Sequence, residues 1–371
     1  MIPFNKPYIS GKELQYIEDA VARGKLSGNG DYTKKCHTFF EQTYGFSKVL
    51  LTTSCTDALE MSAILLDIQP GDEVIMPAYT FVSTANAFVL RGAVIRFVDS
   101  RTDHPGMDEV AVENLINENT KAIVVVHYAG VACDMDEVQR IAQKHNVPMV
   151  EDAAQAFNAT YKGKPLGSFG ALSAFSFHET KNIQCGEGGL LVINDETLQA
   201  RAEIIWEKGT NRSAFFRGEV DKYGWVDIGS SFLPSELNAA YLFAQLEESD
   251  RIQEQRKKIW DAYYKALEEW SNELGIQLPV LPEFASNNAH MFYINCRDAM
   301  QRTQLITHLK KQNVHAVFHY LSLHESPFYQ EKHDGRTLPN SDGYTERLLR
   351  LPLYYELDPQ PVINALLSYD S

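Results

Sequence analysis

The chain has 371 residues, of which 44% are hydrophobic and 22% are charged. This length suits about two domains of roughly 150 residues, and the composition is that of a globular protein, not of a disordered or fibrous one. The formal net charge of −15, with no cluster of Lys and Arg, disfavours binding to nucleic acid or to an anionic membrane surface.

Strand and helix patterns alternate through the first two-thirds of the chain. Residues 48–53 are predicted as a strand, and the helix that follows carries apolar residues at helical spacing. The other predicted strands cover residues 73–77, 93–99, 122–128, 147–152, 172–178 and 188–194. Helices are predicted over residues 80–92, 108–117 and 136–145. Apolar strands separated by such helices indicate a doubly wound α/β domain with a mostly parallel sheet.

The pattern changes after about residue 194. A helix is predicted over residues 196–208, a polar and aromatic loop over 209–231, and one long helix over 235–270. The remainder reads as a smaller α+β unit, built from residues 290–296 and 314–320 with helices over 303–312 and 345–350. We therefore predict a large domain of residues 1–245 and a small C-terminal domain of residues 246–371.

Several features indicate the cell compartment. The five cysteines are scattered and never spaced C-x-x-C, which fits neither a disulfide framework nor a zinc site. No basic segment followed by an apolar one marks a secretory signal at the N-terminus. The longest apolar stretch, residues 122–126, is far shorter than the roughly 20 residues that span a bilayer. We expect a soluble cytoplasmic protein without a membrane or nucleic-acid partner.

Ligands of doubly wound sheets bind beyond the carboxyl ends of the strands, and the first such end carries hydroxyl groups. Thr53, Ser54, Cys55 and Thr56 follow the first strand and open a helix, which favours an anion site for a phosphate. Taken alone, these residues are more simply explained by ordinary helix capping, which Ser or Thr provides at most helix starts. Neither G-x-x-x-x-G-K-[ST] nor G-x-G-x-x-G is present, so the two common nucleotide folds are disfavoured.

Two further strand ends carry ionisable side chains. The strand over 147–152 ends in Glu151 and Asp152, and the strand over 172–178 leads to Lys181. A carboxylate can pair with a cationic ring nitrogen, and a lysine can form a Schiff base, although each is more often a cap or a surface residue. Together with a phosphate site, these groups are what pyridoxal phosphate requires.

The segments PGDEVIMPAYTFVSTANA, VPMVEDAAQA and SFHETKN followed by GEGG occur in this order. In these motifs the chain resembles the DegT/DnrJ/EryC1/StrS family of sugar aminotransferases over nearly its whole length. The resemblance implies a fold-type I enzyme that uses pyridoxal 5′-phosphate, with pyridoxamine phosphate formed during turnover. It also implies a homodimer with shared active sites.

The resemblance assigns roles to the residues at the strand ends. Lys181 would hold the cofactor and Asp152 would face its ring nitrogen. Gln155 would lie near the phenolic oxygen of the ring, and Phe81 would stack on the ring. The phosphate would be held by Ser176, Cys55, Thr56 and Asp57. Ser231, where the family commonly has asparagine, would reach the phosphate of the neighbouring subunit.

Within the family, HYAGVACDMD, EKGTNRSAFFRG and DIGSSFL resemble the members that aminate C4 of dTDP-4-keto-6-deoxy-D-glucose. This implies L-glutamate as donor, 2-oxoglutarate as its product, and dTDP-4-amino-4,6-dideoxy-D-galactose for a polysaccharide of the enterobacterial common antigen type. The substrate diphosphate needs basic groups, for which Lys208, Arg212 and Arg217 are candidates. His319 and His324 are candidates for contacts with the sugar. No metal site is expected, since His315 and His319 have no third ligand at suitable spacing.

Three other functions are conceivable for a chain with this resemblance. Some relatives dehydrate deoxysugars, but these carry histidine in place of the lysine, so Lys181 favours amino transfer. A C3 aminotransferase, or a gluco-configured product, is not excluded by any residue of the sequence. A non-catalytic sensor with the same fold is less favoured, because it would not need Asp152, Gln155 and Lys181 together.

Overall fold

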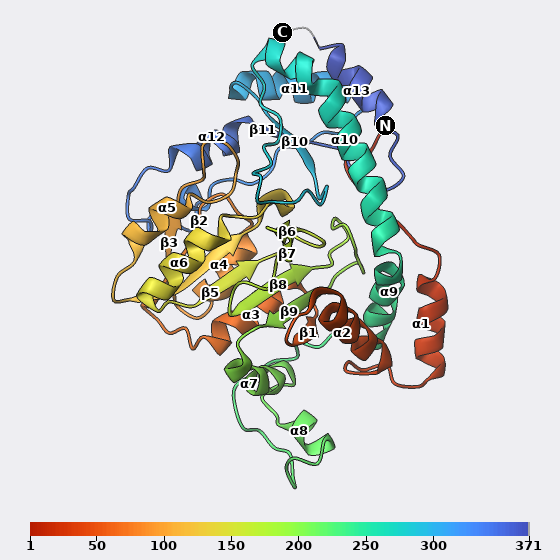
Figure 1. The fold of residues 1–371 in the computed structure, drawn as a ribbon, viewed down its shortest axis with the longest axis vertical. Helices are drawn as coiled ribbons and strands as arrows, with labels where there is room; N and C mark the ends of the chain where they lie inside the picture. The colour runs from red at the N-terminus through yellow and green to blue at the C-terminus, as the bar shows by residue number, and fades with distance from the viewer. Residues whose placement is uncertain (370–371) are drawn as a thin grey trace.

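The computed structural model describes residues 1–369 and is built around a seven-stranded sheet (Figure 1). Its strands, in spatial order, are β1 (Val49–Thr52), β9 (Gly189–Ile193), β8 (Leu172–Ser176), β5 (Met149–Asp152), β4 (Thr120–Val126), β2 (Glu73–Pro77) and β3 (Val94–Val98). Strand β9 runs antiparallel to both of its neighbours, and all other pairings described are parallel. The predicted mostly parallel sheet is confirmed.

Helices cover both faces of the sheet. One face packs against α2 (Asp31–Tyr44), α6 (Met135–His145) and α9 (Glu236–Glu247), and the other against α3 (Cys55–Leu65), α4 (Val82–Val89) and α7 (Glu196–Trp206). Strand β4 explains this division, because Ile123 and Val125 point to the first core while Ala122 and Val124 point to the second. A strand buried on both faces must be apolar throughout, as the sequence pattern indicates.

The C-terminal part has a separate core. It contains α10 (Ser249–Leu274), α11 (Ala299–Lys311), α13 (Gln360–Leu367) and the antiparallel pair β10 (Phe292–Asn295) and β11 (Leu348–Leu351). Figure 1 shows α10 running from beside the sheet to these elements. The start of the chain joins them, since Ile2 pairs with Val314. The division at residue 245 remains a prediction.

The remaining elements are short or peripheral. Helix α1 packs against α9. Along the part of the chain that the structure describes, no helix is both long enough and apolar enough to span a bilayer. The bounds are α1 (Glu13–Ala22), α5 (Glu109–Val112), β6 (Thr160–Tyr161), β7 (Lys164–Pro165), α8 (Arg212–Phe216) and α12 (Pro339–Arg347), with 3-10 turns at Glu113–Leu115, Tyr128–Gly130 and Leu323–Glu325.

The structure differs from the predicted elements in three places. The long helix predicted over 235–270 is two helices, which meet at Glu248 with φ −106° and ψ 8°. The helix predicted over 345–350 is wrong beyond Arg347, because the following residues form β11 and pair with β10. This long-range pairing buries three leucines of β11 and overrides the local helical pattern. The predicted loop over 209–231 contains the short helix α8.

Candidate active site

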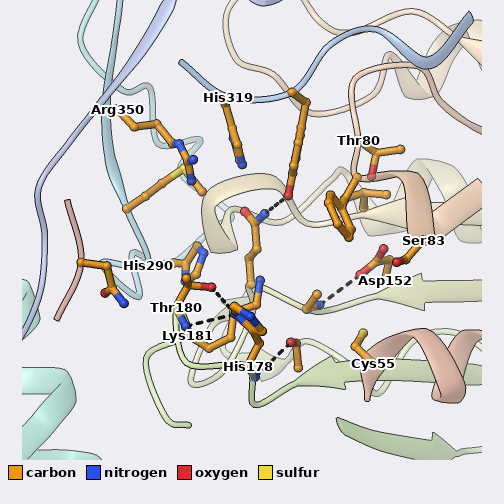
Figure 2. A pocket seen from close by; sticks show the side chains of 18 of the residues that line it. Cys55, Thr80, Ser83, Asp152, His178, Thr180, Lys181, His290, His319 and Arg350 are labelled. Atoms are coloured by element: carbon orange, nitrogen blue, oxygen red, sulfur yellow. Dashed lines mark hydrogen bonds between the residues drawn. The ribbon is translucent and has the colours of Figure 1, made fainter. Parts of the chain in front are cut away.

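A cavity of about 580 Å³ lies at the carboxyl ends of the parallel strands (Figure 2). Its floor comes from the start of α3, the end of β5 and the end of β8. Strands β5 and β8 are neighbours in the sheet, and α3 follows β1, which is separated from β8 by β9 alone. The C-terminal part supplies the opposite wall through His290, His319 and Arg350. Residues far apart in the sequence therefore meet where the fold class predicts a ligand.

The start of α3 forms one side of this cavity. Ser54 caps the helix, since its hydroxyl accepts a hydrogen bond from the Asp57 N–H at 3.1 Å. The N–H groups of Cys55 and Thr56, both of which line the cavity, have no acceptor within the helix. A Cβ atom on Gly189 would lie 2.3 Å from the carbonyl carbon of Ser54, so this glycine lets the turn approach the sheet. Such a helix start suits a phosphate group.

Asp152 ends β5 and is buried at the cavity wall. The Thr84 hydroxyl donates to its Oδ2 at 2.7 Å, and the Ala154 N–H donates to its Oδ1 at 3.2 Å. Thr84 in turn lies 2.9 Å from the Thr80 hydroxyl. Burial raises the pKa of Asp152, whereas these two donors and the charge of Lys181 act in the opposite direction. The carboxylate is thus held in one orientation by groups that favour its ionised form.

Lys181 lies in the loop after β8, and its N–H donates to the carbonyl of His178 at 2.9 Å. Its amine lines the cavity, and no hydrogen bond or ion pair from a side chain of residues 1–369 holds it. Burial lowers the pKa of Lys181, and the charge of Arg350 acts in the same direction. Asp152 opposes this shift. The amine is therefore more easily deprotonated than an exposed lysine.

Gln155 and Phe81 form another part of the lining. Gln155 Oε1 accepts from the Ala129 N–H at 2.6 Å, and its Nε2 donates to the Tyr320 hydroxyl at 2.8 Å. These bonds fix the amide. Phe81 precedes α4, and its ring centroid lies 6.0 Å from that of Tyr320. With 55% of its surface exposed, Phe81 keeps a free aromatic face.

Two other residues predicted to hold the phosphate differ in position. Ser176, at the end of β8, lines the cavity, and its hydroxyl lies 3.4 Å from the His178 N–H. Asp57 does not line the cavity, because its carboxylate accepts a hydrogen bond from the Thr53 hydroxyl and its N–H is used by Ser54. Cys55 has a raised pKa because its thiol is buried, so it is a poor nucleophile.

The predicted diphosphate ligands lie elsewhere in this chain. A second cavity, of about 910 Å³, is lined by Ser231, Lys208, Arg212 and Arg217 together with α2 and β1 residues. Ser231 pairs with Glu207 through a β-bridge, and Arg217 forms an ion pair with Glu203 at 2.8 Å. None of these residues lines the first cavity.

The two histidines predicted to contact the sugar, His319 and His324, do not lie in the same place. His319 lines the first cavity, and its Nδ1 lies 2.6 Å from the Tyr128 hydroxyl. His324 is buried outside the cavity, where its ring centroid lies 5.0 Å from that of His333.

Four residues of the site were not singled out by the sequence: Thr84, His290, Tyr320 and Arg350. Thr84 carries a usable signal, because it stands one helical turn after Thr80 in the motif PAYTFVSTANA. The others come from the C-terminal part and reach the cavity only through long-range packing.

A model of the DegT/DnrJ/EryC1/StrS aminotransferase family matches residues 7–366, which is nearly the whole chain. The protein belongs to this family. An uncharacterized protein of Methanocaldococcus jannaschii is 32% identical over 98% of this chain and 96% of its own length.

Solved structures of aminotransferases have the same fold. The aminotransferase TlmJ of Streptoalloteichus hindustanus is 27% identical, with a TM-score of 0.90 over 99% of this chain and 98% of its own. The putative sugar aminotransferase Spr1654 of Streptococcus pneumoniae, in its PLP form, is 26% identical, with a TM-score of 0.90 over 99% and 97% of the two chains. The same protein is known in a PMP form. This protein is accordingly a sugar aminotransferase that depends on pyridoxal phosphate.

The cavity of this aminotransferase fits that cofactor. Pyridoxal phosphate needs an anion site, an acid beside its ring nitrogen and an amine for its aldehyde. The start of α3, Asp152 and Lys181 offer these groups around one cavity. The amine of Lys181 is the clearest sign, because it lines the cavity without a polar partner among the described side chains and is free to bond an aldehyde there.

Proposed function

We propose that this aminotransferase moves an amino group from L-glutamate to C4 of dTDP-4-keto-6-deoxy-D-glucose. The product would be dTDP-4-amino-4,6-dideoxy-D-galactose, a precursor for polysaccharide of the enterobacterial common antigen type. The observation that carries amino transfer is the placement of Lys181 and the buried Asp152 at one cavity. The segments HYAGVACDMD, EKGTNRSAFFRG and DIGSSFL support this particular sugar.

The chemistry divides between the cofactor and the chain. When bound, pyridoxal phosphate supplies the carbonyl that exchanges the amino group and a ring that takes up the charge of a deprotonated carbon. Asp152 would hold a proton on the ring nitrogen, and Thr84 and Ala154 orient its carboxylate for this purpose. The open face of Phe81 orients the ring.

Lys181 carries the proton transfers of both half-reactions. Its Nζ removes the proton from the α-carbon of the donor and delivers a proton to C4 of the sugar in the second half. Burial lowers the pKa of Lys181, which favours the free amine that acts as base. A solvated lysine at the same place would be protonated for most of the time near neutral pH.

We also propose that two copies of the chain share their active sites. Support comes from the segment after α7, which includes α8 and projects from the rest of the molecule (Figure 1); in it Trp225 is 86% exposed and Phe216 is 68% exposed. Large exposed apolar side chains of this kind mark contact surfaces. Lys208, Arg212 and Ser231 beside this segment would then serve the cavity of the partner subunit. Light scattering should give the mass of a dimer, and Trp225→Asp should shift the protein toward monomer with loss of activity; a fully active monomer would contradict sharing.

A single-turnover experiment tests the proposed reaction. The holoenzyme is treated with L-glutamate, the donor is removed, and dTDP-4-keto-6-deoxy-D-glucose is added. Return of the visible cofactor band with one amino sugar per site is expected, and NMR of the product should give the galacto configuration. If the band returns only with a 3-keto isomer, the C4 assignment is wrong. Multiple turnovers by Lys181→Ala would overturn the role of the lysine.

A further inference from the structure

The side chain of Arg350 lies in the wall of the cavity and has no anionic or hydrogen-bonding partner among the described residues. It projects from β11, opposite Tyr293 of β10, and its guanidinium lies 4.7 Å from the ring centre of Phe4. Its Nε is buried and has no hydrogen-bond acceptor. Within residues 1–369 no carboxylate pairs with this guanidinium. Figure 2 shows it reaching into the cavity from the wall that also carries His290 and His319.

Another buried arginine shows what a structural role looks like in this chain. Arg256 of α10 is buried, and it donates to the carbonyls of Ala289 and His290 at 3.2 and 2.7 Å. A cation removed from water is costly unless it is paired and hydrogen-bonded. Arg256 meets that requirement through backbone carbonyls, whereas Arg350 does not. Arg350 is only partly buried, but its guanidinium faces the cavity without an acceptor from the described residues, so an anion that enters the cavity is a complementary partner.

His290, beside Arg350, presents an acceptor to the same space. The Asn182 amide nitrogen donates to Gln253 Oε1 at 3.0 Å and to the Asn288 carbonyl at 2.8 Å, which fixes the orientation of this amide. Asn182 Oδ1 must then accept from His290 Nδ1, 2.9 Å away. Burial lowers the pKa of His290, as do the nearby charges of Lys181 and other cations, so the imidazole is neutral. Its Nε2 consequently carries a lone pair and no proton.

We propose that Arg350 binds the carboxylate of the amino donor and that His290 Nε2 accepts a hydrogen bond from the donor's amino group. A guanidinium beside a bare nitrogen is complementary to the two polar groups of an α-amino acid. This inference rests on the proposed function, because it assigns the donor half of the same site.

The depth of Arg350 favours a carboxylate over the diphosphate of the nucleotide sugar. The donor's carboxylate is bonded directly to the carbon that loses its proton to Lys181, so its ligand must be close to that lysine. Arg350 meets this condition, since it lines the same cavity as Lys181. The diphosphate is attached to C1 of the sugar, across the ring from C4, and therefore lies farther from Lys181.

Binding measurements on holoenzyme variants test the assignment. Three probes are titrated separately: L-glutamate, followed by the visible band; glutarate, a dicarboxylate without an amino group; and dTDP. Arg350→Gln should raise the Kd of L-glutamate and of glutarate by about 10- to 100-fold and change the Kd of dTDP by no more than about twofold. Arg350→Lys should recover part of this loss, because it keeps the charge but not the planar fork. Arg297→Gln, at an exposed ion pair with Asp298, is the matched control and should change nothing.

His290→Phe separates the two halves of the proposed contact. This variant should raise the Kd of L-glutamate by about fivefold and leave the Kd of glutarate unchanged, since only L-glutamate carries the amino group. Equal weakening of both probes would contradict a contact with that group.

Other outcomes overturn the proposal. If Arg350→Gln weakens dTDP while glutarate is unaffected, the guanidinium binds the diphosphate; if no probe changes, it binds neither. Arg350→Met should leave the melting temperature nearly unchanged, because the Arg350 side chain is only partly buried and forms no hydrogen bond or ion pair within the described residues. A clear fall would show a structural role. A parent enzyme that binds glutarate but does not react with L-glutamate would contradict the proposed donor and leave the carboxylate site standing.

Discussion

The hydrogen bond from Thr84 to Asp152 gives the most sharply defined prediction. Replacing Thr84 by Val keeps the shape of the side chain and removes the hydroxyl that lies 2.7 Å from Asp152 Oδ2. A hydrogen bond to a charged group contributes about 1.5–3 kcal/mol, and Asp152 retains only the longer bond from Ala154. The ionised form of Asp152 should be destabilised by roughly this amount relative to the protonated form, which raises the pKa of the carboxyl further.

The consequence should be visible in the pH dependence of turnover. Asp152 must be ionised to hold the proton on the ring nitrogen, so the acid limb of kcat should move to higher pH in Thr84→Val. At neutral pH, kcat should fall by about tenfold or more, whereas KM for the sugar should change little. The matched control is Thr303→Val on α11, where the hydroxyl bonds only to the Ala299 carbonyl and the side chain is exposed. An unchanged acid limb together with unchanged kcat would refute the role given to Thr84.

Two predictions concern stability. His37 has a pKa lowered to about 3 by burial, and its Nε2 accepts from the Leu51 N–H at 2.9 Å. Because the unfolded histidine titrates near 6.5, the unfolded state binds more protons between these values, and stability falls as the pH drops through this window by at most about 1.4 kcal/mol per pH unit. His37→Gln should flatten the fall measured by urea unfolding between pH 7 and 5, and an equal slope in both proteins would argue against it. Gly189→Ala should destabilise the fold by about 1–3 kcal/mol and weaken cofactor binding, since the new Cβ meets the Ser54 backbone. The control Gly224→Ala, which has open space, should do neither; a stable Gly189→Ala protein that retains its cofactor would be the contrary result.

The sequence predicts the sheet well because its signals are local. Apolar strands such as β4 are read directly from residues 120–126, and polar side chains such as Asp152 mark where a strand ends. The pairing of β10 with β11 is set by contacts between segments over 50 residues apart, so the leucines of β11 were predicted as helical. Local patterns contain no information on such pairing.

The cavity also combines features that local sequence predicts with features that depend on long-range packing. Its floor follows strand ends, and those can be found from the sequence. Arg350 stands between buried leucines in an ordinary apolar segment, and nothing near it in sequence indicates a charged group that faces a cavity. His290 acquires its defined proton position only through Asn182, which is 108 residues away. These features depend on the folded chain, and the structure was needed to find them.

Lys181 is proposed to be the amine that holds the cofactor. Borohydride reduction of the holoenzyme, which fixes the cofactor to the amine that carries it, followed by peptide mapping tests this directly. One labelled residue, Lys181, is expected, and prior treatment with L-glutamate should prevent the labelling because the cofactor then leaves the lysine. A label on another lysine, or labelling that L-glutamate does not affect, would contradict the account.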